Sequence, residues 1–153
     1  MLTLAPVANT DFDEMVDLRI EALRESLERL GRFDPVRARE RLASRFVPEY
    51  MLHMVLDSER IGFITLRPDC EQGSISVQLD HLYVRPAFQG RGIGAWALDW
   101  AKSRAVLKNC SITLSALKQS AANRFYLRHG FIQVGEGEFD LDYCWSGPNG
   151  VPT

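Results

Sequence analysis

Cysteine is scarce in this sequence, long hydrophobic runs are missing, and neither sign of charge dominates. The three cysteines, Cys70, Cys110 and Cys144, form no CxxC pair, which argues against a disulfide framework or a structural zinc site and favours reduced thiols in a cytoplasmic protein. Eighteen basic and twenty acidic residues give a net charge of −2, so no general attraction to nucleic acid or an anionic membrane is expected. Apolar runs such as Met51-Leu52 are too short to span a membrane, and residues 1–6 do not resemble a signal peptide.

The composition is that of an ordinary globular domain. Hydrophobic residues make up 46% of the 153 residues and charged residues 25%, which argues against disorder. Since no linker, repeat or low-complexity tract interrupts the chain, we expect one domain over residues 1–146. The glycines and prolines of residues 147–153 predict a flexible tail.

Periodicity and turn signals predict a mixed α+β fold in the order β-αα-βββ-α-β-α-ββ. Apolar residues at helical spacing from Phe12 to Leu30 indicate a first helix, and Asp34-Pro35 opens a second. The expected strands are residues 2–5, 50–57, 61–68, 74–84, 111–117, 131–134 and 139–145, and the two later helices are residues 92–107 and 120–129.

The fourth expected strand contains an irregularity. Its apolar residues alternate up to Leu79 and resume at Leu82, so the phase slips by one residue at Asp80-His81. Such a slip is typical of a β-bulge, which leaves backbone groups unpaired and available to a ligand. The alternative is that Tyr83 is simply buried and the strand is regular.

A glycine-rich turn follows this strand and leads directly into a helix. In Gln89-Gly90-Arg91-Gly92-Ile93-Gly94 three glycines alternate, so backbone amides can converge at a helix N-terminus and bind a pyrophosphate. The turn lacks the Gly-Lys-Ser/Thr ending of a Walker A loop, and five residues lie between Val84 and Gly90, unlike in a Rossmann turn.

A third element supplies a candidate acid. Phe125 and Tyr126 project about 100° apart on a helix, so both cannot occupy one apolar face. The phenol of Tyr126 beside a cleft can donate a proton; the alternative is a boundary tyrosine with its hydroxyl in water.

Together these segments resemble the GNAT N-acetyltransferase superfamily. The resemblance lies in Leu82-Tyr83-Val84-Arg85-Pro86, in Gln89-x-x-Gly92-x-Gly94 and in Phe125-Tyr126-x-x-x-Gly130-Phe131. It implies a mostly antiparallel seven-stranded sheet with about four helices, in which a bulged fourth strand splays from the fifth and acetyl-CoA lies in the gap.

The resemblance also implies roles for individual residues. Backbone groups of the fourth strand hold the pantetheine and the thioester carbonyl, loop 89–94 holds the pyrophosphate, and Tyr126 protonates the leaving thiolate. The residues expected to bind the cofactor are Leu82, Tyr83, Val84, Gln89, Gly90, Arg91, Gly92, Ile93, Gly94, Asn123 and Tyr126.

Two positions depart from the family pattern. Gln119 stands where many members have asparagine, and Asn123 can replace that asparagine or face solvent. Gln78 stands where many members have a glutamate as general base, which leaves Asp80, His81 or a chain of waters as the base.

The expected function is transfer of the acetyl group of acetyl-CoA to a primary amine by direct attack, with no metal. A non-catalytic acyl-CoA-binding module and a protein binding another nucleotide are the alternatives. The acceptor, a small molecule or a peptide, stays open, as does a possible homodimer. Arg37, Arg41 and Arg45 form either a solvated helix face or a wall of the acceptor site that attracts an acidic group. The acidic run from Glu136 to Asp142 is either a solvated hairpin or a surface that attracts a cationic amine.

Overall fold

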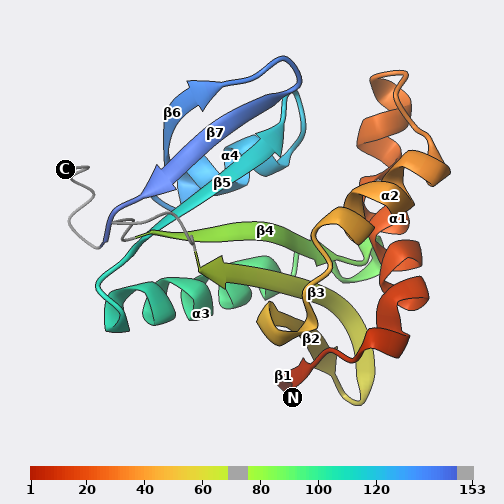
Figure 1. Cartoon of the computed structure of the whole chain (residues 1–153), viewed down its shortest axis with the longest axis horizontal. Coiled ribbons are helices and arrows are strands. Elements are labelled where there is room, and N and C mark those ends of the chain that lie inside the picture. The colour runs from red at the N-terminus through yellow and green to blue at the C-terminus, as the bar shows by residue number, and fades with distance from the viewer. Residues whose placement is uncertain (69–75, 148–153) are drawn as a thin grey trace. The chain divides into compact units, whose positions relative to one another are not determined.

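The computed structural model describes residues 1–68 and 76–147. Within these ranges seven strands form one sheet in the order β1-β2-β3-β4-β5-β7-β6, and four α-helices connect them (Figure 1). The order along the chain is the predicted one, so the mixed α+β class is confirmed. Cys70, the expected turn at 69–73, the first two residues of the strand expected at 74–84, and the tail beyond residue 147 lie outside the described residues.

The bounds of the elements agree closely with the sequence pattern. The strands are β1 Leu2–Pro6, β2 Met51–Leu56, β3 Glu59–Pro68, β4 Ser76–Val84, β5 Ser111–Leu117, β6 Ile132–Glu136 and β7 Asp140–Trp145. The helices are α1 Phe12–Arg29, α2 Pro35–Ser44, α3 Ile93–Leu107 and α4 Ala122–Arg128.

The chain divides into two compact units, each described by itself below. The first comprises Met1–Thr65 and His81–Ala97, and the described part of the second comprises residues 66–68, 76–80 and 98–147. A single domain over residues 1–146 stays a prediction.

In the first unit, α1 packs against α2, and both contribute to its core. Asp34 caps α2 as predicted, since its carboxylate accepts hydrogen bonds from the backbone amides of Val36 and Arg37. The buried members of this core are Val7, Met15, Val16, Leu18, Leu42, Met51 and Phe63.

A glycine in β3 permits a close approach of the β4 backbone. A Cβ atom at Gly62 would clash with the carbonyl oxygen of Tyr83, lie 3.2 Å from the Cα of Val84 and lie 2.8 Å from the Cε of Met54. One residue away, the amide of Arg85 donates to the carbonyl of Ile61 at 2.8 Å. The absence of a side chain at Gly62 therefore sets the position of the last residues of β4.

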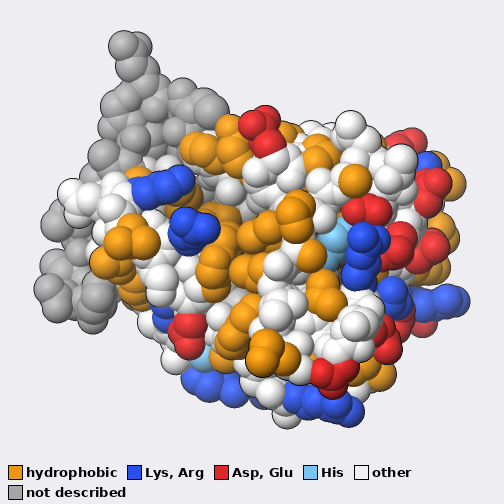
Figure 2. Space-filling view, turned by 90° about the horizontal axis from the view of Figure 1, so that it is seen from below, with side chains coloured by type: hydrophobic (Ala, Val, Ile, Leu, Met, Phe, Trp, Pro, Cys, Tyr) orange, Lys and Arg blue, Asp and Glu red, His pale blue; other side chains and the backbone are white. Residues whose placement is uncertain are grey.

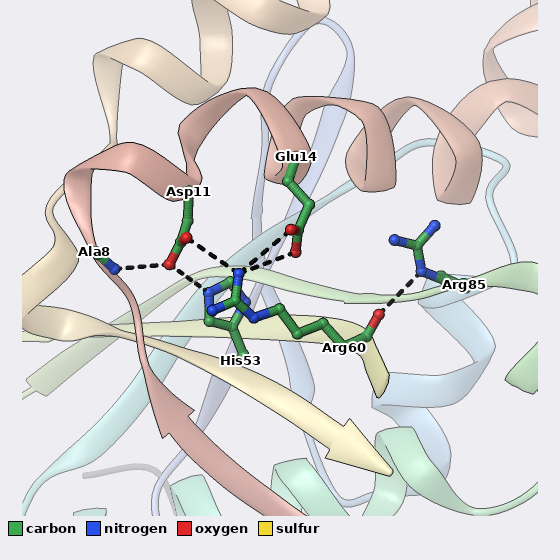
Figure 3. A network of polar contacts seen from close by, with 6 residues as sticks. All are labelled: Ala8, Asp11, Glu14, His53, Arg60 and Arg85. Atoms are coloured by element: carbon green, nitrogen blue, oxygen red, sulfur yellow. Dashed lines mark hydrogen bonds and ion pairs between the residues drawn. The ribbon is translucent and has the colours of Figure 1, made fainter. Parts of the chain in front are cut away.

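A polar cluster ties the start of α1 to β2 and β3 (Figure 3). Asp11 accepts a hydrogen bond from the amide of Ala8 at 2.9 Å, lies 2.9 Å from the Nε2 of buried His53 and pairs with Arg60 at 3.1 Å. The Ala8 amide, followed by His53 and then Arg60, lowers the pKa of Asp11 from 3.8 to about 2, against the opposing effect of burial. The cluster therefore stabilises the unit while Asp11 is ionised.

Side chains of β3 contact two adjacent residues of β4. Thr65 and Arg67 are two residues apart on β3, so their side chains point to the same face. Their partners on β4 are adjacent: Thr65 Oγ1 lies 2.9 Å from His81 Nδ1, and Arg67 Nε lies 2.8 Å from Asp80 Oδ2. Along β4, Val77, Leu79 and His81 are buried and the residues between them are half-buried, so a bulge at Asp80-His81 stays a prediction.

In the second unit, β5 pairs antiparallel with β7, which pairs with β6, and α4 contacts β5. The parallel pairing of β4 with β5 consists of Ser76–Gln78 against Ser111–Thr113. Within the described part of this unit, Leu79 and Asp80 continue β4 without a partner in β5. The two strands therefore separate after Gln78, as the family resemblance implies.

The surface carries both signs of charge. On the face drawn in Figure 2, Lys and Arg side chains lie beside Asp and Glu side chains, with hydrophobic side chains between them. Within the two described ranges, no helix has the length and apolar character needed to cross a membrane.

We predict that Gly62→Ala destabilises the protein by about 3 kcal/mol, because the new Cβ meets backbone that cannot move without breaking the β3–β4 contact. Urea denaturation measures this change. The control is Gly137→Ala, where a Cβ would lie 3.8 Å from the nearest carbonyl oxygen, and we expect a change below about 1 kcal/mol. Equal unfolding midpoints for the two variants would contradict the assigned role of Gly62.

We also predict that stability falls as Asp11 becomes protonated. Because its pKa is lower in the folded state, its contribution is present above pH 4 and is lost as the pH falls toward about 2. Asp11→Asn should therefore cost roughly 1–2 kcal/mol at neutral pH and much less near pH 2. Urea titrations at several pH values measure this difference. Exposed Asp57, which pairs with the N-terminus, is the control: Asp57→Asn should cost under about 0.5 kcal/mol at any pH.

Candidate active site

The end of β4, in the first unit, presents the expected backbone groups. Leu82, Tyr83 and Val84 are each half-buried. The ring of Tyr83 packs edge-on against Phe63 at a centroid distance of 5.4 Å, so the side chain faces the core rather than a ligand. The carbonyl of Val84 already accepts a hydrogen bond from Gln89 Nε2 at 2.9 Å. The side chain of Gln89 thus fastens the glycine turn to the strand that precedes it.

The turn itself has the backbone conformation that only glycine adopts without strain. Gly90 and Gly92 have φ angles of 79° and 78°. The carbonyl of Gly92 accepts from the amide of Trp96 at 3.0 Å, so Gly92 is the N-cap of α3. The first amides of a helix have no partner inside the helix, and here Cβ positions at Gly90 and Gly92 face open space. This arrangement suits an anion.

The other residues of the turn differ in accessibility. Ile93 is buried with 6% exposure and anchors the start of α3, so only its backbone can reach a ligand. Gly94 is the second residue of the helix. Arg91 is exposed, and its guanidinium lies over the ring of Phe88 at 5.2 Å. The side chain of Arg91 is therefore held near the turn without burial of its charge.

The two candidate bases are both engaged by β3. Asp80, in the second unit, has a side chain only 5% exposed and accepts from the Nε and Nη2 of Arg67 at 2.8 and 3.3 Å. His81, in the first unit, is 6% exposed and is hydrogen-bonded to Thr65. Each group must therefore act through these contacts if it accepts a proton.

Tyr126 is buried in the second unit. It is 8% exposed and packs against Phe131 and Tyr143, with ring centroids 5.5 and 6.3 Å away. Phe125, the adjacent residue, is half-buried, as the 100° argument predicts. A tyrosine in this setting is not the solvent-facing boundary residue that was the alternative.

Asn123 does not face solvent. Its Nδ2 donates to the carbonyls of Leu117 and Ser120 at 2.9 and 3.0 Å, and its Oδ1 accepts from the hydroxyl of Tyr143 at 2.8 Å. Burial raises the pKa of Tyr143, which keeps the donor protonated. Asn123 therefore closes the turn before α4. Gln119 lies in this turn and has a left-handed backbone with a φ of 66°.

Other polar residues of the second unit are also paired. Thr113 donates to Gln78 Oε1 at 2.7 Å across the β4–β5 pair, so Gln78 joins the strands where many relatives are expected to have a base. In the acidic run, Asp142 accepts from Ser115 and Glu136 pairs with Lys118. These contacts favour the structural interpretation of both features.

Sequence reasoning missed one buried charge, Arg19. Ile20 packs against the core as the helical pattern predicts, and Leu18 and Arg19, which the pattern left out, are buried beside it at 1% and 9% exposure. The sequence pattern also singled out three arginines at the outer face of α2, and all three are exposed: Arg37, Arg41 and Arg45.

In the described ranges, no three His, Cys, Asp or Glu side chains are grouped so as to hold a metal ion.

Solved structures with this fold include several acetyltransferases. The PaiA N-acetyltransferase of Thermoplasma acidophilum, in complex with coenzyme A, has a TM-score of 0.76 at 17% identity, covering 94% of this chain and 98% of that one. An acetyltransferase of Thermus thermophilus has a TM-score of 0.73 at 20% identity, with coverages of 94% and 96%. The ribosomal-protein-S18-alanine N-acetyltransferase of Escherichia coli has 0.71 at 15%, with 94% and 92%. At such identities the likeness concerns the fold.

No curated protein matches the sequence. A family model does: it describes an acetyltransferase (GNAT) domain and matches residues 49–133. That range is more than half of the 153 residues and contains the β4 motif, the glycine turn and the Tyr126 helix. The resemblance found in the sequence is thereby confirmed, and the chain belongs to the GNAT acetyltransferase family of acyltransferase enzymes.

Proposed function

We propose that this protein transfers the acetyl group of acetyl-CoA to a primary amine by direct attack, without an acyl-enzyme intermediate. The glycine turn carries the proposal: it combines two left-handed glycines, open Cβ positions and the N-terminus of α3. This is the backbone arrangement that a pyrophosphate requires. The coenzyme A present in the Thermoplasma acidophilum structure of the same fold supports this ligand.

The separation of β4 from β5 supplies the second element of the proposal. After Gln78, the described residues of β4 in the second unit leave the parallel pairing with β5, so their backbone groups need other partners. Backbone groups of Leu82 and Val84 can then align the pantetheine and donate to the thioester oxygen as it gains negative charge.

The reaction requires the amine to lose a proton and the CoA thiolate to gain one. The amine nitrogen attacks the thioester carbon, the C–S bond breaks, and the CoA thiolate takes a proton from the hydroxyl of Tyr126. The proton lost by the amine passes to Asp80 or His81, or to water. Free Cys110 and Cys144 show no partner pattern for acyl transfer, and reduced thiols favour a cytoplasmic location.

An acceptor screen tests the activity as a whole. Thiol release from acetyl-CoA is measured with polyamines, amino acids, aminoglycosides and peptides with free N-termini. Release that depends on one amine class supports the proposal. Tight binding of acetyl-CoA without release for any amine would instead favour the non-catalytic module.

Gly92→Ala should weaken acetyl-CoA binding at least tenfold, because a methyl group intrudes where the pyrophosphate meets the helix amides. Calorimetry measures the affinity. Gly31→Ala is the matched control, since Gly31 also has a left-handed φ, 68°, and an open Cβ position. Both variants should lose about 1 kcal/mol of stability, but only Gly92→Ala should lose affinity. Equal affinities would show that the turn does not bind the cofactor.

Tyr126→Phe should lower kcat by about 10²-fold or more while the KM for acetyl-CoA changes little, because the proton is needed only as the C–S bond breaks. Steady-state kinetics under chemistry-limited conditions measure both. Tyr143→Phe is the control: it removes a buried phenol that bonds Asn123, so it should cost about 1 kcal/mol of stability with kcat within about twofold of the wild type. A near-normal kcat for Tyr126→Phe removes this residue from the mechanism.

A further inference from the structure

Arg19 is a buried cation in the first unit. It lies on α1 with 9% exposure, its guanidinium stands over the ring of Tyr83 at 5.6 Å, and its Nη1 donates to the carbonyl of Ala38 at 3.2 Å. Tyr83 in turn lies 5.9 Å, ring to ring, from His81, one of the candidate bases. Arg19 therefore belongs to the α1-facing side of β4, where His81 and Tyr83 project.

Within the described residues no carboxylate pairs with Arg19. Three acidic side chains of α1 pair with other arginines: Asp13 with Arg39 at 2.6 Å, Glu14 with Arg60 at 3.3 Å and Glu21 with Arg85 at 2.7 Å. All of these arginines are more exposed than Arg19. The most buried arginine of the cluster is thus the one without a counter-charge.

One nitrogen of the Arg19 guanidinium, Nε, has no hydrogen-bond partner among the described residues. This nitrogen is fully buried, and the Nη1 bond to Ala38 uses the opposite side of the group. The Nε–Nη2 edge is the one that binds a carboxylate with two parallel hydrogen bonds. Arg67 uses that same edge for Asp80 in this protein.

A buried charge of this kind costs several kcal/mol unless a partner compensates it. A structural role explains the bond to Ala38 and the stacking on Tyr83, but it does not explain why Nε is left without an acceptor. A ligand carboxylate supplies both the missing acceptor and the missing negative charge.

We propose that Arg19 binds a carboxylate of the acceptor, so that the substrates of this enzyme are amines that also carry a carboxylate group. The inference rests on the proposed acetyl transfer to an amine. It assigns to Arg19 the role in acceptor selection that the sequence pattern left open for the arginines of α2, whose side chains are exposed.

Matched pairs of acceptors test the inference. Each pair differs by one carboxylate: L-lysine and cadaverine, β-alanine and ethylamine, L-ornithine and putrescine. Thiol release from acetyl-CoA gives kcat and KM for each. The wild type should prefer the carboxylate-bearing member. Arg19→Met should lower kcat/KM for that member roughly 10- to 100-fold, mainly through KM, and leave the other member within about twofold.

Arg24→Met is the control on the same helix. Arg24 forms an exposed ion pair with Glu28 four residues away, so its loss should leave the preference intact. A second readout is thermal unfolding of the free protein. Arg19→Met removes an uncompensated buried charge and keeps the length of the side chain, so the Tm should stay the same or rise.

The outcomes separate the two proposals. Acetylation of both members at equal rates by the wild type overturns the inference about Arg19 and leaves the proposed function standing. A fall in Tm for Arg19→Met, with equal losses on both members of each pair, shows a structural arginine and also overturns it. Binding of acetyl-CoA without acetylation of any amine contradicts the proposed function itself.

Discussion

The close contact between Gly62 and the Tyr83 carbonyl is the constraint on which the first unit depends. It holds the last residues of β4 against β3, and the bond from Arg85 to Ile61 continues the contact. The glycine turn begins five residues after β4 and is fastened to it by Gln89. A shift of the β4 backbone at Gly62 would therefore displace the amides that precede α3.

Most charged groups near the candidate site serve the fold, and this limits which of them can do chemistry. Asp80 and His81 are both held by side chains of β3, through Arg67 and Thr65. The bidentate pair with Arg67 holds the Asp80 carboxylate in place. Arg19 differs from them, because its Nε has no hydrogen-bond partner among the described residues. The contrast between satisfied and unsatisfied groups is what distinguishes a ligand contact from a structural one.

Much of the fold was predictable because its signals are local. The capping of α2 by Asp34, the order of elements and the glycine turn each follow from a few neighbouring residues. The bulge inferred from the phase slip at Asp80-His81 stays a prediction, because Val77, Leu79 and His81 are buried in regular alternation. The inner face of α1 was predicted less well: Arg19 occupies a buried position that hydrophobic periodicity cannot assign to an arginine.

The sequence by itself determined the family, the element order and the residues of the turn, since each depends on spacing along the chain. Only the tertiary structure decided how Asn123 is used, because its partners include Tyr143, twenty residues away. It also decided that Arg19 stacks on Tyr83 and that its Nε has no hydrogen-bond partner among the described residues. Whether a buried polar group is satisfied depends on which distant segments meet it, and no local pattern contains that information.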